Sequence, residues 1–181
     1  MTDPYATHLP LLKVIGFIFS VRNVLELGSG LYSTPLFCNP VYFSEIVKVQ
    51  SYETDRAWAK KVRAFLMDND ILHLQHSTVP LAEVIPFLDL NAFDLIFVDD
   101  GHSLAERKAT IQAVTEWHPF NLVLMHDYEQ PAYQEASQGF DHVLLYKDAF
   151  PNTAILWNDG TGVDEEHLQQ LNLLINLECF R

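Results

Sequence analysis

The stretch from Val24 to Thr34, VLELGSGLYST, decides the fold of this chain. An apolar run that carries one acid, Glu26, ends in two glycines, Gly28 and Gly30, and a helical pattern follows. Glycines directly after a strand permit positive φ and let a ligand approach the backbone closely. The helix that follows would direct its unpaired N–H groups at that ligand. The stretch therefore predicts a strand, a ligand-binding turn and a helix, with a tight turn that binds nothing as the alternative.

The acid in this strand narrows the choice of ligand. A buried carboxylate without partners is costly, so Glu26 should have hydrogen-bond donors waiting. We expect a cationic amine of the ligand, or a network that reaches one, to supply them. The NAD-type fingerprint needs a third glycine three residues after the second, and Ser33 stands at that place. The incomplete fingerprint and the acid together argue against a nicotinamide cofactor.

Short apolar blocks alternate with amphipathic segments along the rest of the chain. This alternation predicts an α/β, Rossmann-like, seven-stranded and mostly parallel sheet with helices on both faces. The connection 148–152 is too short for a crossover helix, so the last two strands should form an antiparallel pair at one edge. The expected strands are Asn23–Leu27, Ile46–Ser51, Leu72–His76, Phe93–Val98, Leu122–Met125, His142–Tyr146 and Thr153–Trp157. The expected helices include Leu9–Val21, Asp55–Leu66, Ser103–Trp117 and Asp164–Leu177.

Length and charge limit the partners. The 181 residues fit a single domain, 1–181, with a leading helix in 1–21 and a C-terminal helix at 164–177 that could pack on the sheet or support a homodimer. The net charge of −13, with no basic stripe, argues against nucleic acid and against an anionic membrane surface. Cys38 and Cys179 have no metal or redox spacing, which favours reduced thiols and a cytoplasmic protein. Trp58, Trp117 and Trp157 lie in apolar patterns and are expected in the core.

Three motifs in order resemble the class I S-adenosylmethionine-dependent methyltransferases. They are VLELGSG, then Glu53 in VQSYETD, then FDLIFVDDGH, and the resemblance runs from about Val21 to Trp157. It implies a glycine loop that holds the methionine end of the cofactor, an acid that accepts both ribose hydroxyls, and a contact to adenine after the third strand. The implied cofactor-binding residues are Glu26, Gly28, Ser29, Gly30, Glu53, Ser77 and Asp99. At the place of Ser77 an acid or amide is commoner in the family.

Acids and histidines follow the next two strands. Asp99 and His102 follow the fourth strand and His126 and Asp127 the fifth, so all should lie at the carboxyl edge of the sheet, where ligands bind. VDDGH followed by MHDYEQP is similar to the small-molecule and sugar O-methyltransferases, many of which hold a divalent ion there. The resemblance implies Asp99, His126 and Asp127 as ligands. Carboxylates suit Mg²⁺ and a histidine favours a transition metal, while a metal-free site is the other interpretation.

Catechol-type members place a lysine base three residues after the acid of the fourth strand, and this chain has His102 there. A histidine titrates near neutrality and could accept a hydroxyl proton, with Asp99 or Asp127 orienting it, although a residue that merely begins a helix is the alternative. The resemblance implies methyl transfer from S-adenosylmethionine to a hydroxyl of a small molecule or glycan. The alternatives are a non-catalytic cofactor-binding module and a transferase of other chemistry, such as aminopropyl transfer.

Overall fold

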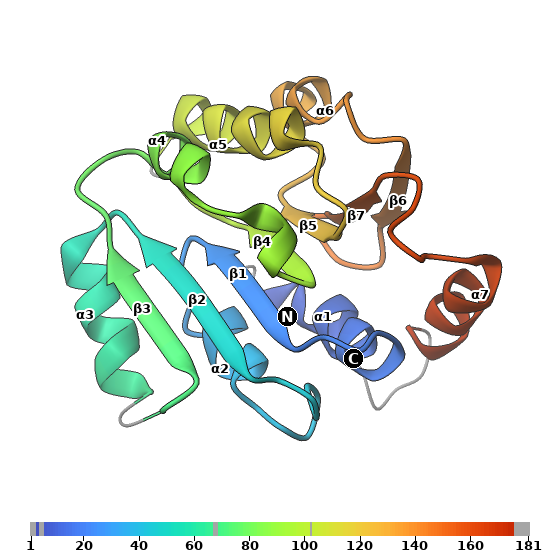
Figure 1. The fold of residues 1–181 in the computed structure, drawn as a ribbon, viewed down its shortest axis with the longest axis horizontal. Coiled ribbons are helices and arrows are strands. Elements are labelled where there is room, and N and C mark those ends of the chain that lie inside the picture. Colours follow the sequence, from blue (N-terminus) through green and yellow to red (C-terminus); the bar gives the residue numbers. More distant parts are fainter. Residues whose placement is uncertain (1–2, 4–5, 67–68, 102, 176–181) are drawn as a thin grey trace.

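The computed structural model describes residues 3, 6–66, 69–101 and 103–175. Seven strands in this part of the chain form one sheet in the order β3-β2-β1-β4-β5-β7-β6 (Figure 1). They are β1 (Asn23–Leu27), β2 (Lys48–Glu53), β3 (Leu72–His76), β4 (Leu95–Val98), β5 (Leu122–His126), β6 (His142–Tyr146) and β7 (Thr153–Trp157).

The strand directions confirm the predicted fold class. β1 pairs in parallel with β2 and β4, β2 with β3, and β4 with β5. β7 is antiparallel to both of its neighbours, β5 and β6, so it lies between them and leaves β6 at the edge. β4 and β5 are buried along their whole length, as strands covered on both faces should be.

Two predicted strands begin too early. β2 starts at Lys48 rather than Ile46, because the N–H of Ile46 donates to the carbonyl of Phe43 in a turn. β4 starts at Leu95 rather than Phe93, because Asp94 belongs to the preceding loop and its side chain binds backbone N–H groups. The Asp94 carboxylate accepts hydrogen bonds from the N–H groups of Arg22 and Asn23, both at 2.8 Å.

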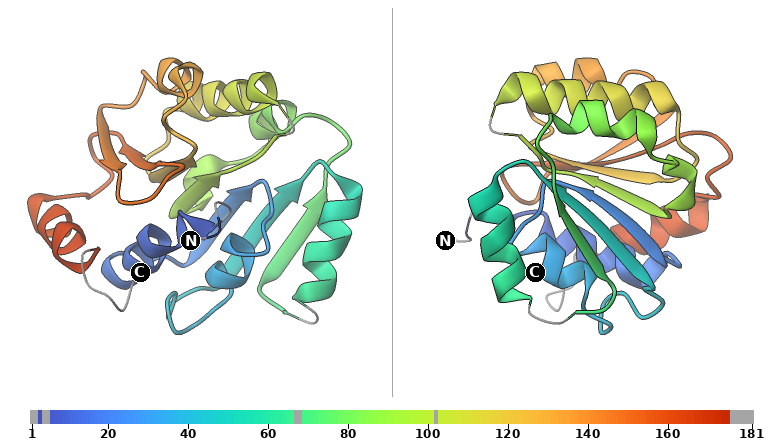
Figure 2. Two further views of the ribbon diagram at one scale, coloured as in Figure 1. Left: turned by 180° about the vertical axis from the view of Figure 1, so that it is seen from behind. Right: turned by 60° about the vertical axis from the view of Figure 1, so that its left-hand side comes forward.

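Helices cover both faces of the sheet (Figure 2). One face carries α1 (Leu9–Ile18), α2 (Ser33–Phe37), α3 (Arg56–Phe65) and α7 (Glu165–Leu174), and the other carries α4 (Leu81–Val84), α5 (Leu104–Trp117) and α6 (Pro131–Ala136). Two 3₁₀ turns, Ile85–Phe87 and Leu90–Ala92, follow α4.

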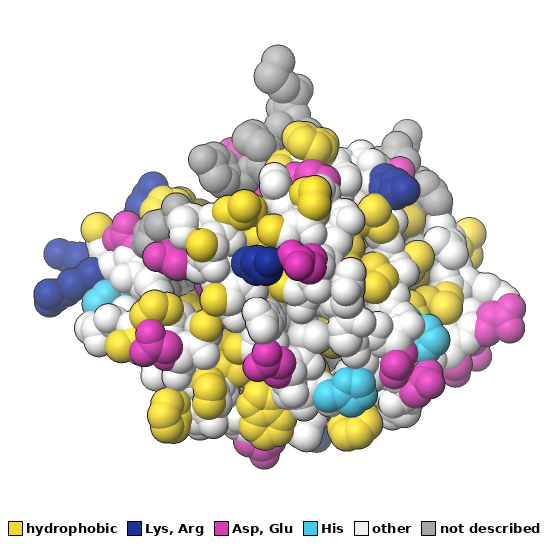
Figure 3. All heavy atoms as spheres, turned by 90° about the horizontal axis from the view of Figure 1, so that it is seen from above, with side chains coloured by type: hydrophobic (Ala, Val, Ile, Leu, Met, Phe, Trp, Pro, Cys, Tyr) yellow, Lys and Arg dark blue, Asp and Glu magenta, His cyan; other side chains and the backbone are white. Residues whose placement is uncertain are grey.

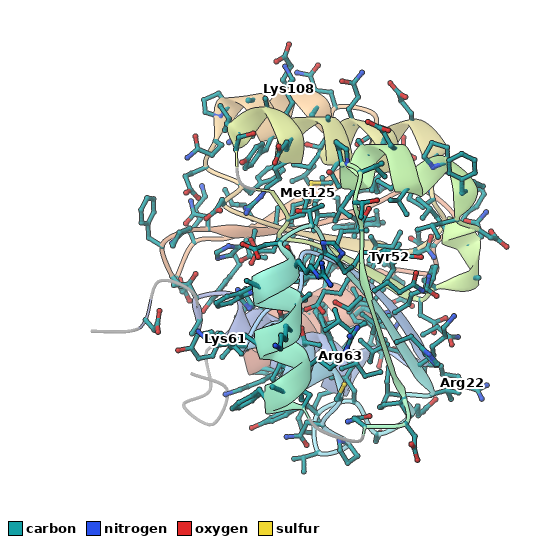
Figure 4. The ribbon with its side chains drawn as sticks, turned by 90° about the vertical axis from the view of Figure 1, so that its left-hand side faces the viewer. Arg22, Tyr52, Lys61, Arg63, Lys108 and Met125 are labelled. Atoms are coloured by element: carbon teal, nitrogen blue, oxygen red, sulfur yellow. The ribbon has the colours of Figure 1, made fainter. Side chains whose placement is uncertain are left out.

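Each face has its own hydrophobic core. Phe37 of α2 and Phe97 of β4 belong to the first, and Leu171 of α7 is buried in the same cluster. Tyr52 and Met125 belong to the second, and both lie in the interior of the molecule (Figure 4). The C-terminal helix therefore packs on its own domain, whereas a homodimer stays a prediction.

On the face over α4, α5 and α6, acidic side chains lie scattered among apolar and polar ones, and lysines and arginines form no continuous stripe (Figure 3). None of the helices in the described ranges has both the length and the apolar character that a membrane span requires.

Candidate active site

Gly28, in the turn after β1, lies against the backbone that follows β4. Its φ is +96°, and a Cβ added there would lie 2.4 Å from the carbonyl oxygen of Asp99. The N–H of Asp99 in turn donates to the carbonyl of Leu27 at 2.8 Å. The glycine is therefore required by the close approach of two strand ends, and it keeps the turn beside the acids that follow β4.

Glu26 is fully buried and is satisfied by the protein itself. Its carboxylate accepts hydrogen bonds from the hydroxyls of Ser33 at 2.6 Å, Thr34 at 2.7 Å and Ser51 at 2.5 Å. Burial raises the pKa of Glu26 to about 7, although these hydrogen bonds oppose the rise. We expected a cationic amine of the ligand, or a network that reaches one, to supply the donors, and the described residues supply three neutral hydroxyls. Ser33 also lines the pocket described next, so any effect of Glu26 on a ligand passes through that hydroxyl.

A pocket of about 860 Å³ runs along the carboxyl edge of the sheet. A smaller one, of about 380 Å³, adjoins it and shares Asp100 and Gly101 with it. The large pocket is lined by these predicted site residues: Ser29, Gly30, Glu53, Asp99, His126 and Asp127. Ser77 lines the smaller one. The sheet edge thus brings most of the predicted residues to two adjoining hollows, while His102 lies outside the described residues.

Glu53, the last residue of β2, presents a fixed carboxylate to the large pocket. Its Oε1 accepts the N–H of Asp55 at 2.8 Å and its Oε2 accepts the hydroxyl of Ser29 at 3.2 Å. A carboxylate offers about four acceptor positions, so about two remain for a ligand with hydroxyl groups. Asp55 caps α3 by accepting the N–H groups of Ala57 and Trp58, which fixes the backbone just after Glu53.

Two of the three tryptophans lie elsewhere than predicted. Trp58 lines the large pocket instead of the core, and its indole N–H donates to the carbonyl of Ser29 at 2.7 Å. The ammonium group of Lys61, on α3 (Figure 4), lies 4.6 Å from the centre of its ring. Trp117 is 38% exposed, and Trp157 is buried as expected. Trp58 therefore stabilises the glycine turn through its hydrogen bond to the Ser29 carbonyl.

A guanidinium group that the sequence did not predict organises the acids. Arg107, on α5, lies 3.1 Å from Asp99 and 2.5 Å from Asp127, and its Nε donates to the backbone carbonyl of Asp100. Burial alone would raise the pKa of Asp99, but the hydrogen bond from His126 and the charges of His126 and Arg107 hold it below its ordinary value. Asp99 is thus held in its ionised form, and both Asp99 and Asp127 are already paired with Arg107.

Asp100 differs from these two acids. It is buried, its Oδ2 accepts the hydroxyl of Thr110 at 2.6 Å, and its Oδ1 has no hydrogen-bond partner among the described residues. Burial raises the pKa of Asp100 to about 7. A carboxyl group at the junction of the two pockets is therefore protonated over part of the neutral range.

Two histidines meet at the back of the large pocket. Nδ1 of His126 lies 3.3 Å from Asp99 and 3.4 Å from Asp127, and its Nε2 lies 2.9 Å from the hydroxyl of Thr7. Burial would lower the pKa of His126, but the neighbouring acids raise it overall. The His8 ring packs edge-on against that of His126, with centroids 4.9 Å apart, and burial lowers the pKa of His8 to about 4. His126 is therefore held on both nitrogens, whereas His8 is a neutral ring.

Sequence reasoning missed both Arg107 and His8. Arg107 stands four residues after Ser103, the N-cap of α5, so it lies one turn into the helix that leaves the acid motif. That spacing is a signal, but charged residues at such places are usually solvated. His8 directly precedes the apolar helix α1, and no local pattern indicates that this helix begins over the carboxyl edge of the sheet.

The residues present fit S-adenosylmethionine. The glycine turn and Glu53 share one hollow, and Glu53 keeps acceptor positions for hydroxyl groups. The volume of about 860 Å³ lies in the upper part of the range of about 300–1,000 Å³ that is typical of ligand sites. The adjoining hollow beside Ser77 adds a further volume of about 380 Å³.

Comparison with protein-family models and with curated proteins finds no match for this chain. Solved structures do match. Spermidine synthase from Thermotoga maritima aligns with a TM-score of 0.65 and 17% identity over 93% of this chain and 63% of that one. Human methyltransferase-like protein 13, in complex with SAH, aligns with a TM-score of 0.58 and 15% identity over 94% of this chain and 90% of that one. An O-methyltransferase family protein from Burkholderia thailandensis gives 0.56 and 14%, over 83% and 56%.

These similarities concern architecture. The chain spans less than two thirds of the length of the spermidine synthase and of the Burkholderia protein. Several of the matching proteins were solved with the demethylated cofactor, S-adenosylhomocysteine. The strand order, the antiparallel β7 and the glycine turn that follows β1 complete the agreement. The chain has the fold of the class I S-adenosylmethionine-dependent methyltransferases.

Proposed function

We propose that the protein transfers a methyl group from S-adenosylmethionine to a hydroxyl group of a small molecule or a glycan. The observation that carries this proposal is one pocket that joins Glu53 and the glycine turn to a cluster of ionised side chains. The bound cofactor would supply the activated methyl group. The protein would hold it with the turn at Ser29 and Gly30 and with the carboxylate of Glu53, while Glu26 orients Ser33 behind the turn.

The charge balance favours a hydroxyl acceptor over an amine. Asp99 and Asp127 are both paired with Arg107, whose side chain is only 11% exposed. An ammonium group that entered the cluster would meet the guanidinium group as well as the acids. A neutral hydroxyl can donate to a paired carboxylate without displacing that cation. Because in-line methyl transfer depends mostly on alignment, fixed acceptors such as these contribute by positioning the acceptor oxygen.

His102 is our candidate for the general base, since it follows Gly101, which lines the pocket. His126 is a poorer candidate, because Thr7 and two acids occupy both of its nitrogens. We expect His102→Ala to lower kcat and to remove the neutral-range inflection from the pH profile of kcat, while leaving cofactor affinity unchanged. An unaltered pH profile would leave His102 without this role.

Cofactor binding tests the first half of the proposal. Calorimetry with S-adenosylhomocysteine should give one site, and Glu53→Gln should weaken it about tenfold or more, because a charged acceptor is lost to the ribose. Glu83 is exposed and is not among the residues that line either pocket, so it provides the matched control. The Glu83→Gln variant should bind S-adenosylhomocysteine as tightly as wild type does. If the wild-type protein gives no heat and no thermal shift with this nucleoside, cofactor binding is ruled out.

Transfer tests the second half. The protein is incubated with methyl-labelled cofactor and a panel of hydroxyl compounds, phenols, sugars and amines, and labelled products are separated from the cofactor. Label in hydroxyl compounds supports the proposal. Cofactor retention without any labelled product would instead support a non-catalytic binding module.

A second candidate is aminopropyl transfer, which the fold agreement with spermidine synthase favours. It would need carboxylates that can accept a polyamine, and the pairing of Asp99 and Asp127 with Arg107 works against that. Incubation with decarboxylated cofactor and putrescine separates the two candidates, because only aminopropyl transfer yields a longer polyamine and methylthioadenosine.

A further inference from the structure

We propose that His8, Asp99 and His126 form a binding site for a divalent transition metal, with Zn²⁺ as the best match. One ligand atom from each residue can be chosen so that all three lie within 4.8 Å of one another. The three side chains also line the large pocket. The inference goes beyond the proposed function, since metal binding at these residues does not require that the protein transfers a methyl group.

His8 is the independent sign of a ligand. It is 2% exposed, and neither ring nitrogen has a hydrogen-bond partner among the described residues. Burying a polar group without a partner costs about 1–3 kcal/mol, so such groups are rare unless something binds them. The ring lies against the His126 ring, at 4.9 Å between centroids, and lines the same pocket as Asp99. A cation bound in this corner of the pocket would accept the lone pair of a His8 ring nitrogen.

His126 and Asp99 have the spacing of two ligands of one ion. If Nε2 of His126 carries the proton, it donates to the hydroxyl oxygen of Thr7, and Nδ1 then directs a lone pair at Asp99. Nδ1 lies 3.3 Å from Oδ1 of Asp99. Without a metal, a proton on Nδ1 makes this contact a hydrogen bond to Asp99, and a cation bound to both atoms would replace that proton. In a tetrahedral zinc site with bonds of about 2.0 Å, two ligand atoms are about 3.3 Å apart.

The hydrogen bond to Thr7 supports the same interpretation. Histidines that bind metals almost always donate the other ring N–H to an oxygen, which fixes the tautomer and the ring orientation. Two imidazoles and one carboxylate suit Zn²⁺ and its neighbours better than Mg²⁺. Three protein ligands would leave a position open, as in catalytic zinc sites.

This set differs from the one that the family resemblance implies, because His8 replaces Asp127. The Oδ2 of Asp127 is taken by Arg107 at 2.5 Å. Asp99 contacts Arg107 and His126 through Oδ1, at 3.1 Å and 3.3 Å. Asp99 makes the longer ion pair with Arg107, 3.1 Å against 2.5 Å for Asp127, and it is the carboxylate that groups with His8 and His126, so we assign Asp99 to the site.

The test uses the full chain, stripped with a chelator and titrated with Co²⁺ and Zn²⁺ alone. We expect one equivalent of Co²⁺ to bind and to give visible absorption bands typical of a low-coordinate site, and Zn²⁺ to abolish them. Changes in groups that merely surround a metal cost about 10–100-fold in affinity, so His8→Gln or His126→Gln should cost about 100-fold or more.

Two control variants make the result specific. His142 is exposed and lies 2.7 Å from Asp159, so it represents adventitious binding by a surface pair, and His142→Gln should leave the Co²⁺ affinity unchanged. Asp127→Asn separates the two ligand sets and should change the affinity far less than His8→Gln does. The proposal is overturned if wild type binds no tighter than the His8→Gln variant, or if Asp127→Asn loses as much as His8→Gln.

A second measurement covers the case in which His8→Gln does not fold. Wild-type protein with ¹⁵N-labelled histidine rings is titrated with Zn²⁺ and followed by NMR. Two buried rings should shift with one equivalent of zinc, and they should still do so in the His142→Gln variant. Shifts confined to exposed rings, or no shifts at all, would refute the site even if the cofactor binds normally.

Discussion

The buried acid of β1 yields a prediction about the pH dependence of folding. Burial raises the pKa of Glu26 from an ordinary value of 4.5 to about 7. The folded protein therefore holds this proton more tightly than the unfolded chain does. The resulting stabilisation is fully present below about pH 4.5 and is lost as pH rises through about 7. Above that pH the native state must keep a buried negative charge on three neutral hydroxyls.

The size of the effect follows from the two pKa values. Each pKa unit corresponds to 1.36 kcal/mol, so the full difference is about 3 kcal/mol, and most of it falls between about pH 5 and pH 8. Ionisation of Asp100 should lower the stability of the protein over a similar pH range, because burial also raises the pKa of Asp100 to about 7. Wild type alone therefore cannot assign the loss to either residue, but Glu26→Gln removes only the share of Glu26.

The measurement is urea unfolding of wild type and Glu26→Gln at about pH 5 and about pH 8. We expect similar stabilities at pH 5, where Glu26 is protonated and resembles the amide. At pH 8 the variant should be more stable by about 2–3 kcal/mol, because no buried charge forms. The exposed Glu83 supplies the control, and Glu83→Gln should follow wild type at both values. Parallel curves for wild type and Glu26→Gln would refute the reasoning.

Two further predictions concern the link between β1 and β4. Gly28→Ala should lower the free energy of unfolding by more than about 3 kcal/mol, since a Cβ would lie 2.4 Å from the Asp99 carbonyl oxygen and φ is +96°. Gly162→Ala is the comparison, because φ there is +81° but nothing lies within 4 Å, and it should lower the free energy by only about 1–2 kcal/mol. Arg107→Met should cost about 2–3 kcal/mol at neutral pH, because Asp99 and Asp127, each about a quarter exposed, lose their cation. Lys108→Met, which removes an exposed partner of Glu135, should cost at most about 1 kcal/mol, and equal losses in the two variants would contradict the assigned role of Arg107.

The neighbouring residue makes the second comparison sharp. Lys108 lies on the outer side of α5 (Figure 4), while Arg107 lies in the pocket wall. Both variants remove one positive charge from the same helix turn. A difference in their stabilities therefore reports local pairing and not net charge. The loss for Arg107→Met should also shrink in acid, where Asp99 becomes protonated, whereas a loss of packing would not depend on pH.

The sequence predicted those parts of the fold that local patterns determine. β1, β6 and β7 match their expected bounds, because each is a short, largely apolar block, and β3 matches as well, although its sequence LHLQH is more polar. The starts of α3 and α5 were also predicted to within one residue, since the capping residues Asp55 and Ser103 are adjacent in sequence to their helices. The early starts predicted for β2 and β4 show the limit of that approach. Apolar character continued into residues that the structure uses in a turn and in a loop, and hydrogen bonds from distant groups set the real boundaries.

The sequence predicted only those site residues that lie at or just after the ends of strands. The glycine turn, Asp99 and Asp127 follow strands and Glu53 ends one, and the strand order brings them to one pocket. The partners of these residues come from elsewhere. Thr7 lies 119 positions before His126, and Arg107 reaches Asp127 across 20 positions. Such contacts depend on how a helix crosses the sheet, which no local pattern in one sequence specifies.

These partners change what the acids can do for a ligand. Glu26 is satisfied by hydroxyls, and Asp99 and Asp127 are paired with Arg107, so none of the three needs a positively charged group of a nucleoside to stabilise it. Glu53 is different, because it lines the pocket and its two hydrogen-bond partners among the described residues, the Ser29 hydroxyl and the N–H of Asp55, are neutral donors that leave about two of its acceptor positions unused. The affinity for a nucleoside should therefore depend strongly on Glu53 and only weakly on Glu26. This order reverses the emphasis that the sequence alone suggests, where the acid beside the glycine turn is the more conspicuous of the two.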